Sequence, residues 1–264
     1  MDFTPVLYLG ILVFCLIFLY VLAGKYTGLK NNQKKDLILQ YLPGHDCKVC
    51  GFEDCENFAR ELLSNASEFE KCSIVDPHNV DKILGIIGKE PLPAEQKMAV
   101  ISCVGGKQCT DKYDYSGVQT CDAVSRIFRG EKNCIYGCLG FGDCARACPF
   151  DAITQNIGEV PVVNKNKCTG CGKCTDKCPK KIISLIPKKY DVHIRCSSFN
   201  SGRFVRGICL TGCISCGICV KICPTKAIEI KDNLAVIDYE KCTTCGLCID
   251  KCPQNTIERI LPSV

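Results

Sequence analysis

The stretch from Cys242 to Pro253 reads Cys-Thr-Thr-Cys-Gly-Leu-Cys-Ile-Asp-Lys-Cys-Pro, and its spacing decides how this chain folds. Two residues separate each of the first three cysteines, three more lead to the fourth, and a proline follows at once. This spacing is typical of bacterial four-iron clusters, in which three thiolates bind one cluster and the fourth binds the other cluster of a pair. A structural zinc site would instead have two pairs of ligands separated by a longer loop. The stretch therefore predicts iron–sulfur binding.

The same spacing recurs from Cys168 to Pro179 and from Cys213 to Pro224, and an irregular copy runs from Cys134 to Pro149. In the irregular copy the gaps between cysteines are three, five and three residues. The copies form two pairs, whose members are separated by strand-like runs at Val160–Val163 and Leu234–Ile237. A short helical turn is expected after each Cys-Pro. The arrangement resembles the bacterial two-cluster ferredoxin, present twice.

Alignment of the two units leaves unit one without a counterpart of Cys216. Cys134 stands four residues before Cys138, just as Cys209 stands four residues before Cys213. We therefore predict that Cys134 replaces the missing ligand, which leaves Cys209 for another task. The predicted sets in unit one are Cys134, Cys138, Cys144 and Cys178 for one cluster, and Cys148, Cys168, Cys171 and Cys174 for the other. Those in unit two are Cys213, Cys216, Cys219 and Cys252, with Cys223, Cys242, Cys245 and Cys248.

A further group of cysteines lies nearer the N-terminus. Cys47 and Cys50 precede an amphipathic run over 54–63, Cys55 lies at its start, and Cys72 lies beyond it. Three ligands on a loop and the start of a helix, with the fourth after the helix, predict a single four-iron cluster. On spacing alone, a zinc ion is the alternative.

Apart from Cys15 in the N-terminal segment, five cysteines remain outside these sets. Cys121 precedes Cys134 by thirteen residues, and Cys196 precedes Cys209 by the same interval, which suggests a degenerate repeat. We predict that four of the five hold a sixth cluster, in addition to the five clusters above. The alternative is that some are ordinary buried thiols. The five are Cys103, Cys109, Cys121, Cys196 and Cys209.

Cysteine accounts for 26 of the 264 residues, which suggests either a disulfide scaffold or a metal protein. Such closely spaced cysteines cannot form many disulfides of good geometry. The formal net charge of +5 counts each cysteine as neutral, whereas a four-iron cluster with four thiolates carries about −2. The charge is therefore no argument for nucleic-acid binding, and we expect none. No nucleotide-binding loop or catalytic partner for a histidine is evident, so no catalytic residue is predicted.

The N-terminal segment is apolar. No charged residue occurs from Phe3 to Gly24, and a helix of that length spans about 33 Å, enough for a hydrocarbon core of about 30 Å. Lysines follow from Lys25 onward, whereas only Asp2 precedes. The positive-inside rule predicts a single-pass anchor in the cell membrane with the bulk of the chain in the cytoplasm. A cleaved signal peptide, the alternative, would carry its positive charge before the apolar run.

The order of these features resembles the B subunit of the Rnf complex, a membrane-bound, ion-translocating ferredoxin oxidoreductase. The resemblance rests on the apolar segment, on Leu-Pro-Gly-His-Asp-Cys-Lys-Val-Cys-Gly-Phe-Glu-Asp-Cys over 42–55 with its distant Cys72, and on the ferredoxin units. It implies a subunit of a translocase-type oxidoreductase that accepts electrons from soluble ferredoxin and relays them through 4Fe-4S clusters to membrane partners. The chain alone would be an electron carrier. Shorter family members have one ferredoxin unit, so the number of clusters is not implied.

Two other functions stay open at this point. A ferredoxin-like subunit of another reductase or hydrogenase would share the cluster motifs, although the apolar anchor argues against a soluble complex. An iron–sulfur redox sensor needs one labile cluster rather than several.

We expect an α+β chain with a single N-terminal transmembrane helix, a small helical 4Fe-4S domain and two bacterial two-cluster ferredoxin-like units. The expected boundaries are 1–35 for the anchor and linker, 36–92 for the N-terminal 4Fe-4S domain, 93–133 for a cysteine-bearing connecting segment, 134–187 for the first ferredoxin-like unit, 188–208 for a second connecting segment and 209–264 for the second unit.

Between Lys165 and Lys189 there are eight lysines and a single acid, Asp176. The simpler interpretation is that they offset the negative clusters beneath them. The alternative is a docking face for an acidic partner such as soluble ferredoxin, because complementary charge speeds encounter. The residues assigned to this predicted face are Lys173, Lys177, Lys180 and Lys181.

Overall fold

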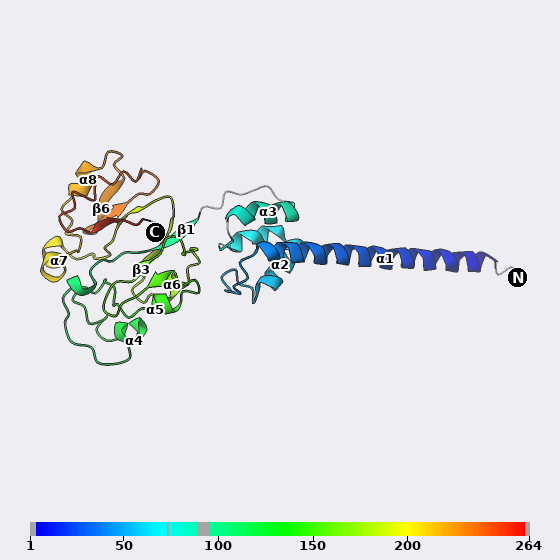
Figure 1. Cartoon of the computed structure of the whole chain (residues 1–264), viewed down its shortest axis with the longest axis horizontal. Coiled ribbons are helices and arrows are strands. Elements are labelled where there is room, and N and C mark those ends of the chain that lie inside the picture. Colours follow the sequence, from blue (N-terminus) through cyan, green and yellow to red (C-terminus); the bar gives the residue numbers. More distant parts are fainter. Residues whose placement is uncertain (1–3, 73, 76, 89–95, 262–264) are drawn as a thin grey trace. The chain divides into compact units, whose positions relative to one another are not determined.

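The computed structural model describes residues 4–72, 74–75, 77–88 and 96–261. The chain divides into two compact units, Met1–Ala94 and Glu95–Val264. The first is helical, whereas the second combines short helices with short strands (Figure 1). The expected α+β content is therefore present.

The N-terminal unit begins with helix α1 (Thr4–Tyr41). Residues 25–35, the end of the predicted anchor and linker, are part of this helix, and their lysines, glutamine and leucine are good helix formers. Cys15 and many other side chains of the predicted anchor lie outside the described residues. In the part of the chain that the structure describes, no helix has both the length and the apolar character required to cross a membrane.

The last turns of α1 pack in the N-terminal unit against α2 (Cys55–Ser64) and α3 (Pro77–Ile87), with the 3-10 helix η1 (Ala66–Lys71) between them in sequence. Helix α2 is amphipathic as predicted, and it buries Phe58 and Leu62 in this core. The cysteines of the N-terminal group therefore border a small helical core.

The described part of the C-terminal unit contains four two-stranded antiparallel sheets. Each ferredoxin-like unit has an internal hairpin and a second sheet, in which its last strand pairs with a strand from the segment before it. Segments 93–133 and 188–208, predicted to be connections, thus each supply a strand. The pairs are β1 (Lys97–Ile101) with β4 (Ile183–Pro187), β2 (Ile153–Thr154) with β3 (Val162–Val163), β5 (Val192–Ile194) with β8 (Ile257–Arg259), and β6 (Ile228–Lys231) with β7 (Leu234–Ile237).

Short helices carry or flank many of the cysteines, and the cysteines themselves form part of both small apolar cores. A core of this size buries little surface, so bound metal is expected to supply much of the folding free energy. The helices are η2 (Gly106–Gln108), α4 (Cys121–Ser125), α5 (Asp143–Arg146), α6 (Lys173–Lys177), α7 (Gly202–Ile208) and α8 (Ile218–Ile222).

The helical turn expected after each Cys-Pro is wrong. The chain instead makes a tight turn and enters a strand. The third residue after the cysteine of each Cys-Pro has a left-handed backbone conformation. A left-handed backbone costs a non-glycine residue roughly 1–2 kcal/mol, so its recurrence at all four positions indicates a shared requirement. The residues are Asp151 (φ 47°), Lys181 (φ 53°), Lys226 (φ 52°) and Asn255 (φ 49°).

We predict that Gly202→Ala destabilises the C-terminal unit. A Cβ atom at Gly202 would lie 2.0 Å from the carbonyl oxygen of Ile214, which is backbone and cannot rotate away. Gly207→Ala in the same helix is the control, because its Cβ would meet nothing within 4 Å. Anaerobic chemical unfolding followed by circular dichroism should show that Gly202→Ala lowers the free energy of unfolding by about 1–3 kcal/mol. The control should be neutral or more stable, and equal stabilities would contradict the prediction.

Candidate iron–sulfur centres

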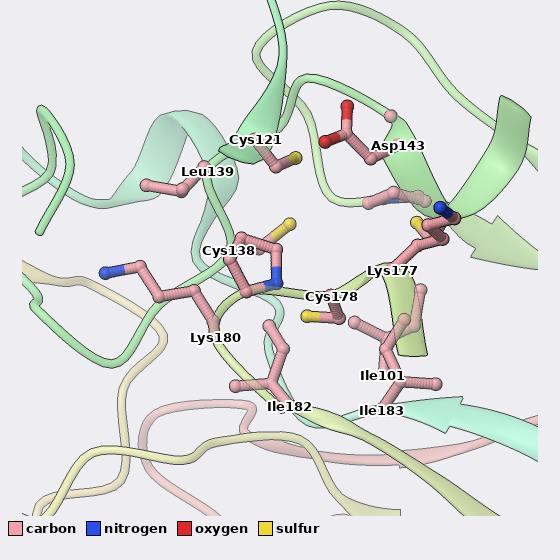
Figure 2. A pocket seen from close by; sticks show the side chains of 14 residues that line it. Ile101, Cys121, Cys138, Leu139, Asp143, Lys177, Cys178, Lys180, Ile182 and Ile183 are labelled. Carbon is pink, nitrogen blue, oxygen red and sulfur yellow. The ribbon is translucent and has the colours of Figure 1, made fainter. Parts of the chain in front are cut away.

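The first cavity of unit one is lined by the cysteines Cys121, Cys138, Cys144 and Cys178. Figure 2 shows the sulfur atoms of Cys121, Cys138 and Cys178 reaching one space from different segments of the chain. The cavity holds about 380 Å³, and its other walls are largely aliphatic, including Ile101 and Ile183. Cys178 thus joins cysteines of the preceding motif, which is the arrangement that the two-cluster ferredoxin pattern predicts.

Cys121, and not Cys134, lines this cavity together with the other three predicted ligands. Cys134 lines a neighbouring cavity. Helix α4 begins at Cys121, where the Thr120 hydroxyl accepts the Ala123 N–H at 3.2 Å. The Asp122 N–H donates to Asp143 Oδ2 at 3.1 Å, and this bond holds α4 beside α5, the helix that carries Cys144.

The second cavity of unit one contains the predicted set. Cys148 of the first motif and the cysteines Cys168, Cys171 and Cys174 of the second line a space of about 300 Å³. The N–H of Ala99 in β1 donates to Cys168 Sγ at 3.4 Å, so the strand from the preceding segment contributes to the wall. One motif thus supplies its last cysteine and the other motif supplies its first three, and, as in the first cavity, cysteines of both motifs meet.

Unit two repeats this arrangement with one cavity of about 380 Å³. Its cysteines are Cys213, Cys216, Cys219 and Cys252. The cysteines of the remaining predicted set also lie near one another. Burial raises the pKa of Cys248 to about 11, and the nearby charges of Cys245, Cys242 and Cys223 add to this shift.

The left-handed turns after Cys-Pro explain part of this geometry. Three residues after Cys223 the chain turns at Lys226, and the next N–H, that of Ala227, donates to Cys223 Sγ at 3.2 Å. The turn after Cys252 likewise directs the Thr256 N–H to Cys252 Sγ at 3.4 Å. Backbone N–H donors stabilise a thiolate, which accounts for the strained residue.

The N-terminal cysteines are positioned by two aspartates. Asp54 caps α2 by accepting the Asn57 N–H at 2.6 Å, and Asp46 Oδ1 accepts the Cys55 N–H at 2.8 Å. Cys72 follows η1 and is half-buried; desolvation raises its pKa to about 11, with smaller contributions from Cys50, Cys47 and Cys55. The four cysteines of the predicted set thus lie near one another.

The chemistry of these sulfurs fits a bound cluster. Burial raises the pKa of Cys144 and Cys219 to about 11 and that of Cys174 to about 12. Without a bound metal these thiols would stay protonated at neutral pH, whereas cluster ligands are thiolates. An iron–sulfur cluster contains iron cations, and their positive charge would stabilise the buried thiolates. Among the described residues, no three His, Cys, Asp or Glu side chains are arranged to hold a single metal ion.

The other sequence-predicted residues take different positions. Cys103, Cys109, Cys134, Cys196 and Cys209 line one cavity between the two ferredoxin-like units. Lys177 and Lys181 are exposed, and Lys173 is half-buried. Lys180 is half-buried and donates to the carbonyls of Arg129 and Ile135, the latter at 2.8 Å. Lys180 therefore has a structural role, which leaves the other three lysines for the predicted docking face.

Comparison with protein families agrees with the cysteine groups. A family described as a 4Fe-4S dicluster domain matches residues 212–256, and another with the same description matches 126–183. A family described as a putative Fe-S cluster matches residues 42–74. The chain therefore carries iron–sulfur domains at the three places where the cysteine motifs occur. Cys121 lies just before the second match, so neither the motif spacing nor this comparison identifies it.

Similarity to characterised relatives extends over most of the chain. It is 37% identical to the B subunit of the Na(+)-translocating ferredoxin:NAD(+) oxidoreductase complex of Acetobacterium woodii, over 90% of this chain and 72% of the relative. It is 36% identical to the B subunit of the ion-translocating oxidoreductase complex of Methanosarcina acetivorans, over 84% of each chain. It is 35% identical to the B subunit of the proton-translocating ferredoxin:NAD(+) oxidoreductase complex of Clostridium ljungdahlii, over 86% of this chain and 80% of the relative.

We predict that Cys121 and Cys178 bind the same cluster. Cys121→Ala and Cys178→Ala should each remove about four irons and four sulfides from the anaerobically reconstituted chain, since one ligand of four is lost. The double variant should lose no more than either single variant. Iron and acid-labile sulfide analysis measures this.

The matched control combines Cys134→Ala with Cys178→Ala. These residues line different cavities, so their losses should add. Additive losses for Cys121 with Cys178 would contradict the assignment of Cys121 to this cavity.

Proposed function

Because the chain belongs to the family of B subunits of ion-translocating (Rnf) oxidoreductase complexes, we propose that it takes electrons from reduced soluble ferredoxin and passes them to other subunits of a membrane complex. The observation that carries this proposal is that groups of four cysteines converge on separate, largely apolar cavities in one compact unit. Each 4Fe-4S cluster, when bound, supplies reversible one-electron chemistry. The chain alone is then an electron carrier within an oxidoreductase that translocates ions.

The residues around the cavities suit this role. The aliphatic walls exclude water, and backbone N–H groups donate to sulfur, as Ala99 does to Cys168 and Thr256 does to Cys252. Hydrogen bonds to the sulfurs and solvent exclusion are two of the levers by which a protein sets the reduction potential of a cluster. The three matched domains support five clusters, and the sequence predicts a sixth.

The alternatives are less well supported. A subunit of an unrelated reductase or hydrogenase would share the ferredoxin-like units, but the similarity to B subunits also includes the N-terminal iron–sulfur domain. A redox sensor needs one labile cluster, whereas separate cysteine groups occur along most of the chain.

We further propose that residues 3–24 anchor the chain in the cell membrane, with the bulk of it on the cytoplasmic side. The described side chains of this part of α1 support the anchor, because large apolar groups such as Phe14, Leu19 and Tyr20 are exposed. A helix that is apolar on all sides is suited to lipid rather than to water.

Deletion of residues 1–24 should release the chain from the membrane. We expect the full chain to stay with the membranes after an alkaline wash, whereas the shortened chain should appear in the supernatant with its iron content unchanged. Fractionation followed by iron analysis checks both points. Retention of the shortened chain in cells that lack its partner subunits would contradict the anchor.

The predicted docking face for acidic ferredoxin lies on unit one. Lys177 and Lys181 line a surface groove, together with Asp176 and with Asp122 and Asp143. Asp122 pairs with Arg126 at 2.9 Å and Asp143 pairs with Arg146, so arginines already neutralise two of the acids. Within the described residues no ion pair is found for either lysine of the groove. The groove therefore keeps positive charge for a partner.

Reversal of this charge should slow electron entry. Lys173→Glu, Lys177→Glu and Lys181→Glu together should lower the rate of reduction by ferredoxin at least about tenfold at low salt, because electrostatic steering changes association rates by about 10 to 10³. The salt dependence of the rate should also flatten, since screening acts over about 8–10 Å at physiological ionic strength. Stopped-flow absorbance measures both quantities.

The control reverses Lys226 and Lys251, which are exposed in unit two. Reduction of every variant by a small uncharged reductant should stay near the wild-type rate. A wild-type rate with ferredoxin for the unit-one variant at low salt would exclude this face as the entry point.

A further inference from the structure

Six cysteines line a cavity between the two ferredoxin-like units: Cys138, which also lines the first cavity of unit one, and five others. Of the five, only Cys134 lies within a matched iron–sulfur domain, at 126–183. Three of the other four come from the segments before the two units, and the fourth, Cys209, is the first residue of unit two. The four are Cys103, Cys109, Cys196 and Cys209.

Backbone pairing brings three of the segments together. Residues 108–112 run between 208–210 and 131–133: the Thr110 N–H donates to the Ile208 carbonyl at 2.8 Å, and the Asn133 N–H donates to the Thr110 carbonyl at 2.9 Å. Cys109 and Cys209 form an isolated antiparallel bridge. The central segment thus holds together Cys109, Cys209 and the start of the chain that continues to Cys134, and all three cysteines line the cavity.

Arg195 holds the remaining two cysteines. Its side chain donates to the carbonyls of Ile101, at 3.0 Å, and Cys103, at 3.1 Å, and its Nη1 pairs with Glu258 of β8 at 2.7 Å. Because Arg195 precedes Cys196 in the chain, it ties the end of β1 to the end of β5. Both strands end at the cavity.

The two units contribute to this cavity in the same way. Cys103 follows β1 and Cys196 follows β5, while Cys134 and Cys209 each stand four residues before the first regular cysteine of their unit. Cys103 Sγ accepts the Cys138 N–H, and Cys196 Sγ accepts the Cys213 N–H, both at 3.4 Å. One pair of cysteines from each unit therefore faces the same space.

Cys109 has no counterpart in unit two, and its hydrogen bonds differ from those of Cys209. The single S–H of Cys109 has two acceptors within reach, the Cys209 sulfur and the Thr110 carbonyl at 3.7 Å, and the Cys109 sulfur accepts only one backbone N–H, that of Cys134. The Cys209 sulfur is instead surrounded by the N–H groups of Thr211 and Gly212 and by the Thr211 hydroxyl. Donors around a sulfur suit a thiolate ligand, whereas a sulfur that donates keeps its proton.

We propose that Cys103, Cys134, Cys196 and Cys209 ligate a further 4Fe-4S cluster between the two ferredoxin-like units, with Cys109 as a hydrogen-bond donor to Cys209. Two cations, Arg195 and the buried Lys132, line the cavity, and they are paired with Glu258 and Asp111 respectively. The hydrogen bonds to the peptides of Cys138 and Cys213 connect this site to a cavity of each unit. This inference deepens the proposed function, but its test measures metal content and does not depend on ferredoxin.

Metal analysis of the full chain, reconstituted anaerobically, tests the existence of the site. The wild-type chain should contain about 24 irons and 24 sulfides with six clusters, and about 20 of each with five. A value near 20 would overturn the proposal without any variant having to fold.

Substitutions test the ligand set. Cys178→Ala, at the first cavity of unit one, is the reference for how much iron is lost with one cluster. Cys103→Ala, Cys134→Ala, Cys196→Ala and Cys209→Ala should each show the same loss, pairs among the four should lose no more than one cluster, and each combined with Cys178→Ala should lose two.

Cys109→Ala is the matched control, because it removes a sulfur from the same cavity and should retain the iron content of the wild type. Loss of a cluster in this variant, or wild-type iron content in any of the four, would overturn the ligand set. The result is independent of electron transfer, so a chain with 24 irons that ferredoxin cannot reduce would contradict the proposed function alone.

Discussion

A thiolate can be buried in a small protein only if cations and hydrogen-bond donors accompany it, and the C-terminal unit is arranged around this constraint. Its cysteines line largely aliphatic cavities, and burial raises the pKa values of Cys144 and Cys174 there. After Cys223 and Cys252, a backbone N–H reaches the sulfur because the chain accepts a left-handed residue just before it. The short strands and helices serve mainly to direct these donors, since none is long enough to form a large core.

The two ferredoxin-like units are variants of one plan. Each combines an internal hairpin with a sheet that borrows a strand from the preceding segment, β1 in one unit and β5 in the other. The difference lies between Cys103 and Cys138, where unit one has 34 intervening residues compared with 16 between Cys196 and Cys213. The additional residues contain Cys109 and α4, and α4 brings Cys121 to the position that Cys216 fills in unit two.

The regular motifs predicted most of this architecture, because their spacing alone determines which cysteines can wrap one cluster. The sets in the second cavity of unit one and the first cavity of unit two lie together as the sequence indicates. The place of Cys121 was not predicted, because it depends on the Asp122 to Asp143 hydrogen bond between segments about twenty residues apart. The thirteen-residue intervals, which paired Cys121 with Cys196, suggested the wrong cavity for Cys121, and the four-residue spacing from Cys134 to Cys138 suggested the wrong cavity for Cys134. The structure also differs from the prediction that Lys180 belongs to the docking face, because a charge pattern does not reveal which lysine donates to backbone carbonyls.

The crossed arrangement of the cysteines has a consequence for synthesis of the chain. A ribosome releases residues in order, so Cys121, Cys138 and Cys144 emerge well before Cys178 can complete their cavity. The other cavity of that unit is completed by Cys174, only four residues earlier. In unit two the corresponding residues are Cys248 and Cys252. Both cavities of a unit therefore become complete almost together, and a nascent chain carries incomplete groups of thiols until then. Iron delivery to each unit is expected to occur in pairs, late in its translation.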